Sequence, residues 1–256
     1  MRLAAVLTVS LLSITPAFAG VVMTVQEEGK ATEEKVYLEA DRARMTSEDG
    51  VAIFRADRKV MWMLDDSDKS YVEVTPETAK KMNEALGGMR QQMDEMLKSM
   101  PPEQRRMMEQ QMGQMAKPVT PAAVKSVYRK TGRSATVGKW RCEEVEHLLD
   151  GKKDEDICAT RLSDLGLARG DIAVMYELEK FMTSMIGTAF NTGKGNGEWE
   201  FDAVGKALGY DAMPVRWRDA GGKTTVLKSI ERGTAPAGSF ELPRGYKKQD
   251  MEMPKP

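Results

Sequence analysis

The stretch VAIFRADRKVMWMLDDSDKSYVEVT, Val51–Thr75, contains three short apolar segments separated by turn-forming residues. In the middle segment, Trp62 and Leu64 point to one side of a strand and Met61 and Met63 to the other. Because both sides are apolar, we expect this strand to be covered on both faces. The separators are too short for a crossover, so the three segments are expected to pair as antiparallel neighbours.

The same pattern extends to both sides of this stretch. Upstream, VVMTVQE, EKVYLEAD and RARMTSE continue the meander back to residue 20, and strand patterns return after residue 125. The sequence therefore predicts an α+β protein built on one curved, unclosed antiparallel β-sheet, a half-barrel of roughly nine to eleven strands. Helices are expected on its concave face, in a single domain over residues 20–250, with a disordered tail at 251–256.

A methionine-rich insertion at residues 76–117 is predicted to form a helical hairpin. Thr75 is the expected N-cap with Pro76 at the first helical position, and Pro101-Pro102 separates the two helices. At 100° per residue the apolar side chains of the first helix share one stripe. They are Met82, Ala85, Leu86, Met89, Met93, Met96, Leu97 and Met100.

These methionines have four interpretations. Thioether sulfur is a soft ligand for Cu(I), but no histidine lies near the run. A membrane-surface helix would carry a more basic polar face. The remaining interpretations are packing of the methionine face on the sheet, and a helical lid over a cavity for an apolar ligand, because methionine adapts to irregular apolar surroundings.

The first 19 residues, MRLAAVLTVSLLSITPAFA, have a basic start, a short apolar run and an Ala-x-Ala end. This pattern is typical of a secretory signal peptide cleaved after Ala19, and the apolar run is too short to span a bilayer. No later segment reaches bilayer-spanning length. We therefore expect a protein exported to the periplasm, with no transmembrane segment.

Two cysteines lie in RCEEVEHLLDGKKDEDICAT, each eight residues from Asp150. A hairpin turning at Asp150-Gly151 would bring Cys142 and Cys158 together, and an exported chain favours a disulfide over free thiols. In an unshifted hairpin Glu144 would face Asp156, which is unfavourable. A slipped register or a bound cation would relieve this repulsion.

No residue pattern indicates catalysis. The only histidine, His147, lies among apolar residues of a predicted strand, where a half-buried histidine without a catalytic or ligand role is expected. We predict no catalytic residues, no metal site and no cofactor. Without the signal peptide 37 basic and 39 acidic residues remain, a net charge of about −2 that argues against nucleic-acid binding.

Three segments carry a resemblance to a known family: FRADRKVMWMLDDSDKSYVEV, GKWRCEEVEHLLDG and PAGSFELPRGYKK, the last with a Phe-x-x-Pro-x-Gly-Tyr finish at residues 240–246. They resemble the secreted bacterial family known as domain of unknown function 4412. The family implies no established activity. By analogy of fold it resembles the LolA-type periplasmic carriers, which implies a curved sheet and helices around an apolar cavity.

The function predicted from these features is a non-enzymatic periplasmic binding or carrier protein for an apolar envelope ligand, such as a lipid or acyl chain. The predicted ligand-binding residues are Trp62, Leu64, Met89, Met93, Met96 and Met182. The alternative is an envelope interaction protein, a stress chaperone or a Cu(I) buffer, that acts through the methionine-rich hairpin.

Overall fold

The computed structural model of the protein describes residues 20–48, 50–101, 104, 125–186 and 201–250. The predicted signal peptide, the second helix of the predicted hairpin and the predicted disordered tail at 251–256 lie outside these residues. The described strands are β1 Val21–Glu27, β2 Glu33–Glu39, β3 Arg42–Ser47, β4 Gly50–Arg55, β5 Val60–Asp65, β6 Ser70–Val74, β7 Ser126–Val137, β8 Trp140–Leu149, β9 Lys152–Arg161, β10 Ala212–Arg218, β11 Thr224–Arg232 and β12 Lys247–Gln249.

These strands form one open sheet in the order β12-β6-β5-β4-β3-β2-β1-β11-β10-β9-β8-β7. Strands β1 to β6 are a meander, as predicted, and β7 to β11 are a second one. Antiparallel pairing of β1 with β11 joins the two. The described residues thus give twelve strands rather than nine to eleven, because the short β12 adds to β6 in parallel. The predicted curved, unclosed, mainly antiparallel sheet is confirmed.

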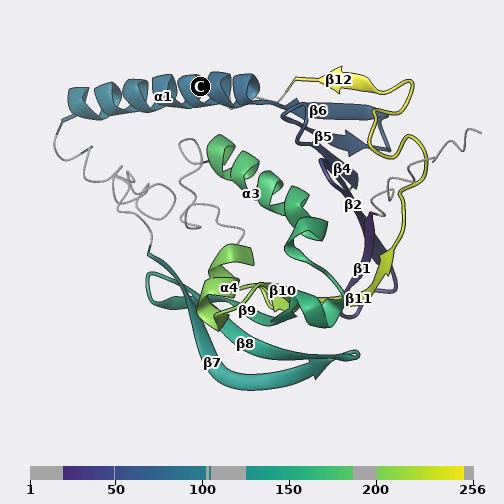
Figure 1. The fold of residues 1–256 in the computed structure, drawn as a ribbon. Coiled ribbons are helices and arrows are strands. Elements are labelled where there is room, and N and C mark those ends of the chain that lie inside the picture. Colours follow the sequence, from purple (N-terminus) through teal and green to yellow (C-terminus); the bar gives the residue numbers. More distant parts are fainter. Residues whose placement is uncertain (1–19, 49, 102–103, 105–124, 187–200, 251–256) are drawn as a thin grey trace, which may run out of the picture.

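The described helices are α1 Pro76–Ser99, α3 Ala173–Ile186 and α4 Phe201–Leu208, with two short 3₁₀ turns at Leu162–Leu165 and Arg169–Ile172. Figure 1 shows α3 and α4 inside the curve of the sheet and α1 running across its upper end. The predicted start of α1 is confirmed. The Thr75 hydroxyl accepts a hydrogen bond from the Thr78 N–H at 3.2 Å, and Pro76 is the first helical residue.

The two faces of the first meander are covered by different parts of the chain. On the inner face, Phe54 of β4 packs against Phe181 of α3, with ring centroids 5.2 Å apart. On the outer face, Ile53 and Trp62 belong to a separate apolar cluster that contains Phe240. Strands β4 and β5 therefore bury alternate residues in different clusters, which explains why β5 is apolar on both sides.

The hairpin of β8 and β9 turns at Asp150 and Gly151, whose φ angles of 49° and 77° suit a tight type I′ connection. The predicted disulfide between Cys142 and Cys158 is present, with 5.4 Å between the Cα atoms. The slipped register is also present. A bulge between His147 and Leu148 places Glu144 opposite Cys158, so that the cysteines bridge diagonally.

Candidate functional site

The inner face of the sheet carries methionines that are only partly buried. Met45 of β3 and Met175 and Met182 of α3 are half-buried against the large inner cluster. Met63 of β5 shares their face by alternation with Met61, and 43% of its surface is exposed. Met63 is in the same cross-strand row as Met45, with Ala52 between them, so soft apolar side chains with free surface share the inner face with the methionines of α3.

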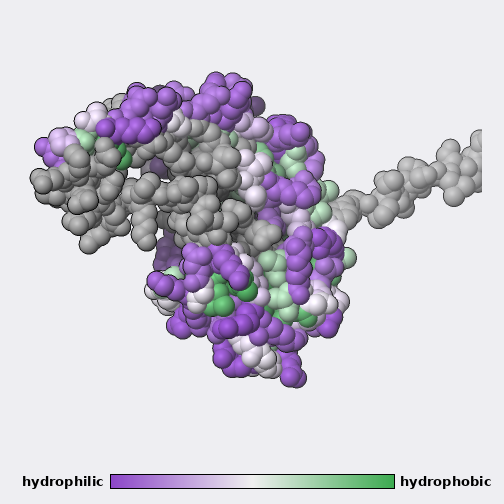
Figure 2. Space-filling view, turned by 90° about the vertical axis from the view of Figure 1, so that its left-hand side faces the viewer, coloured by the Kyte–Doolittle hydropathy of each residue, from purple (hydrophilic) through white to green (hydrophobic). Residues whose placement is uncertain are grey.

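Helix α1 is buried at Ala79 near its beginning and more exposed at Met96 near its end. Ala79 is buried in the inner cluster, and α1 contacts β6 and α3. Farther along, Met96 has 46% of its surface exposed and Leu97 is half-buried. Part of the predicted apolar stripe is thus open to solvent. Figure 2 shows the larger hydrophobic patches (green) in the lower half of one side of the molecule, bordered by hydrophilic residues (purple).

The structure divides the predicted ligand-binding residues between two faces. Met182 lies on the inner side, and Met96 lies on α1. The side chains of Met89 and Met93 lie outside the described part of the structure. Trp62 and Leu64 point to the outer face, where they pack in the cluster of Phe240. They are therefore not brought together with the inner methionines, and their role in binding stays a prediction.

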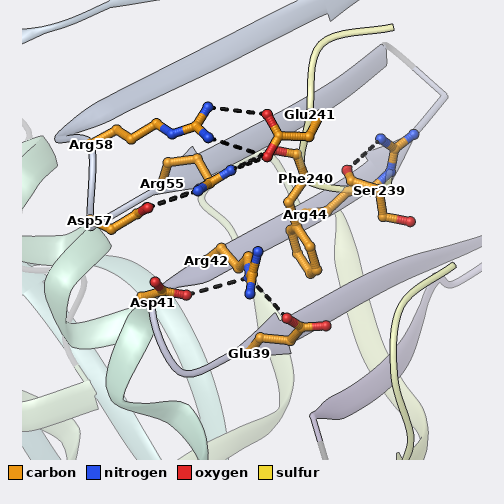
Figure 3. A network of polar contacts seen from close by, with 10 residues as sticks. All are labelled: Glu39, Asp41, Arg42, Arg44, Arg55, Asp57, Arg58, Ser239, Phe240 and Glu241. Carbon is orange, nitrogen blue, oxygen red and sulfur yellow. Dashed lines mark hydrogen bonds and ion pairs between the residues drawn. The ribbon is translucent and has the colours of Figure 1, made fainter. Parts of the chain in front are cut away.

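The C-terminal segment, residues 233–246 between β11 and β12, covers Trp62 and Leu64 and is held by a polar network (Figure 3). Buried Arg55 pairs with Asp57 at 2.7 Å and with Glu241 of the segment. Arg58 also reaches Glu241, at 3.1 Å. These contacts raise the pKa of the Arg55 guanidinium, with the hydrogen bond to Asp57 the largest cause, and its charge is fixed. The outer face of β3 to β5 is thus closed by the chain itself.

A second arrangement involves His147, which the structure buries to 6% exposure. Its Nε2 lies 2.9 Å from the Ser126 hydroxyl oxygen, and its Nδ1 lies 3.3 Å from Asp154 Oδ2. Tyr128 stacks on the imidazole, with centroids 4.4 Å apart. Burial lowers the pKa of His147, and Asp154 opposes this shift in part. The histidine is conspicuous in the sequence, but Ser126 and Asp154 are not, because only strand pairing brings them to it.

A polar recess of about 290 Å³ lies elsewhere on the sheet. Most of its charged side chains already form ion pairs, such as Arg133 with Glu144 at 2.6 Å and Lys153 with Asp156 at 2.6 Å. Its charged walls do not suit an apolar ligand. The lining residues are Glu28, Arg133, Glu144, Lys153, Asp156, Ile157, Arg216, Arg218 and Thr224.

No group of three or more His, Cys, Asp or Glu side chains in the described part of the chain is placed to hold a metal ion. No helix within the same residues has the length and apolar character needed to cross a membrane.

Comparison with known proteins identifies no relative. No protein-family model matches the sequence, and no curated protein matches it. Solved structures of PNGF-II in two crystal forms, P21 and C2, match at TM-scores of 0.36, with 6% and 8% sequence identity. The match covers 90% of this chain and 31% of the PNGF-II chain, so this chain spans about a third of that protein. At this TM-score the likeness supports no conclusion. The resemblance to domain of unknown function 4412 and to LolA-type carriers stays a prediction.

Proposed function

We propose that this protein binds an apolar envelope ligand, such as a lipid or acyl chain, on the concave face of its sheet and carries it in the periplasm. The observation that supports this most is the partial exposure of Met63 on that face, at 43%, among half-buried methionines of β3 and α3. Apolar side chains on a curved inner surface offer burial to a ligand that water solvates poorly.

The arrangement of the two faces supports the same proposal. The outer face of β3 to β5 is sealed by the C-terminal segment and its ion pairs. On the inner side, α1 docks through Ala79 near its start, and Met96 in its last turns keeps 46% of its surface exposed.

The test is fluorescence titration of the mature protein with cis-parinaric acid as an acyl-chain probe, together with native mass spectrometry of protein purified from the periplasm. We expect saturable probe binding and co-purified lipid. Met63→Gln places an amide against the ligand, and an unpaired amide costs about 1–3 kcal/mol, so the Kd should rise about tenfold. The matched control, Met63→Leu, should bind like the parent.

Helix α1 is tested in the same assay by changing Met89, Met93 and Met96 together to leucine, which should preserve binding, or to glutamine, which should weaken it. The proposal is abandoned if the parent binds neither probe nor lipid, or if Met63→Gln binds as tightly as the parent. Tight Cu(I) binding that disappears in the leucine variants would instead establish the copper interpretation.

A further inference from the structure

Three adjacent strands bring Ser126, His147 and Asp154 together. Tyr128 of β7 is directly opposite His147 of β8, and Ser126 lies two residues before Tyr128, on the same face. Asp154 of β9 is the extra residue of the β8–β9 bulge, because His147 pairs with Glu155 and Leu148 pairs with Lys153. Its side chain still faces the imidazole.

The charge of Asp154 beside the ring indicates which tautomer of the imidazole is favoured. The carboxylate of Asp154, 3.3 Å from Nδ1, favours the tautomer that carries its proton on Nδ1. Nε2 then accepts the hydrogen bond that the Ser126 hydroxyl donates at 2.9 Å. Burial lowers the pKa of His147, so the ring is neutral near pH 7 and able to take a proton. The stacked ring of Tyr128 holds the imidazole in this orientation.

The backbone of Ser126 supplies a further group. The Asp150 N–H donates to the Lys125 carbonyl at 3.0 Å, and the Lys125 N–H donates to the Asp150 carboxylate at 2.9 Å, so both backbone groups of Lys125 face β8. Ser126 and Leu149 are the next pair, and the Ser126 N–H therefore points away from β8. Strand β7 is the last strand of the sheet within the described residues, so this N–H lies at the sheet edge. It is a hydrogen-bond donor for an oxyanion that forms on an acyl group bound to Ser126.

We propose that Ser126, His147 and Asp154 form a catalytic site that hydrolyses carboxylic esters. Ser126 Oγ attacks the ester carbonyl carbon while its proton passes to His147 Nε2. The bond to the leaving alkoxide breaks, and His147 returns the proton to it as the alcohol departs. Water then attacks the acyl-enzyme, gives its proton to His147, and releases the carboxylic acid as Ser126 regains a proton. Asp154 positions the imidazole and stabilises its charged form.

The first test labels the folded, oxidised protein with a fluorophosphonate probe, which forms a covalent bond only with an activated serine. We expect one adduct, mapped by peptide mass spectrometry to Ser126. A purely structural hydrogen bond would not produce this mass increase. The matched control is Ser134→Ala, which removes an exposed serine from the same strand and should label like the parent.

The second test measures hydrolysis of p-nitrophenyl butyrate. Ser126→Ala should abolish enzyme-dependent release, and Asp154→Asn should lower kcat by about 10²–10⁴-fold at unchanged unfolding temperature. The proposal is overturned if the folded parent gains no adduct on Ser126, or if Ser126→Ala hydrolyses the ester as fast as the parent. The proposal is independent of ligand carriage, because Ser126→Ala should bind cis-parinaric acid like the parent whichever result is obtained.

Discussion

Replacing Phe240 by alanine tests whether the C-terminal segment is an integral part of the fold. The ring is 6% exposed in the outer cluster with Ile53 and Trp62, and the Arg42 guanidinium lies 5.4 Å from its centroid. An aromatic side chain buries roughly 150–250 Å², which at about 25 cal/mol per Å² gives about 4–6 kcal/mol of transfer free energy. Alanine retains part of this, and a surface segment can partly collapse onto the gap, so the expected loss is about 3 kcal/mol.

The measurement is urea unfolding followed by tryptophan fluorescence, supported by calorimetry, where a domain of this size should lose about 6–12 °C in Tm. Phe240→Leu is the matched control and should lose less than half as much. Binding of cis-parinaric acid should not change, because Phe240 lies on the face opposite the inner methionines. A free energy of unfolding within 0.5 kcal/mol of the parent, on the order of an ordinary surface substitution, would refute this packing.

Three further outcomes are expected. Removing the bridge with Cys142→Ala and Cys158→Ala should cost about 3 kcal/mol by loop entropy, and chemical unfolding with no loss would contradict it. Phe54→Ala should cost about 3–5 kcal/mol, since the ring is fully buried against Phe181, and Phe54→Leu serves as its control in thermal unfolding. Burial lowers the pKa of His147 below its ordinary value, so the unfolded chain binds this proton more readily. The free energy of unfolding is therefore unaffected by this histidine above a pH of about 6.5 and falls as the pH is lowered further. Urea unfolding at two pH values should show this fall in the free energy of unfolding, and His147→Gln should reduce it.

Local features of the fold were predictable because they depend on neighbouring residues. Alternation in Val51–Thr75 identified three strands, Thr75-Pro76 identified the start of α1, and Asp150-Gly151 identified a hairpin turn. Each is decided by side-chain periodicity or by backbone preferences within a few residues. The disulfide of Cys142 and Cys158 followed from that turn, since the hairpin alone brings the two cysteines near each other.

Long-range features were not predictable in this way. Pairing of β1 with β11 joins residues about two hundred positions apart, and no local pattern signals it. Alternation correctly showed that β5 is apolar on both sides. It could not say which side faces α3 and which faces the C-terminal segment. A prediction from alternation alone therefore groups Trp62 and Leu64 with methionines that lie on the other face of the sheet.

The arrangement around His147 combines a two-residue turn with a single extra residue. With Asp150 and Gly151 in the turn, Leu149 opposes Lys152 and Leu148 opposes Lys153, and this register without a bulge would place Asp154 opposite His147. The bulge makes Asp154 the extra residue and sets Glu155 opposite His147, while the Asp154 carboxylate still lies 3.3 Å from the imidazole Nδ1. Beyond the bulge Glu144 opposes Cys158, and its carboxylate pairs with Arg133 and Arg216. The repulsion predicted between Glu144 and Asp156 is thus avoided, but Glu146 now opposes Asp156. Lys153 lies 4.0 Å from the Glu146 carboxylate and 2.6 Å from that of Asp156, so a cation of the chain itself offsets this second acidic pair.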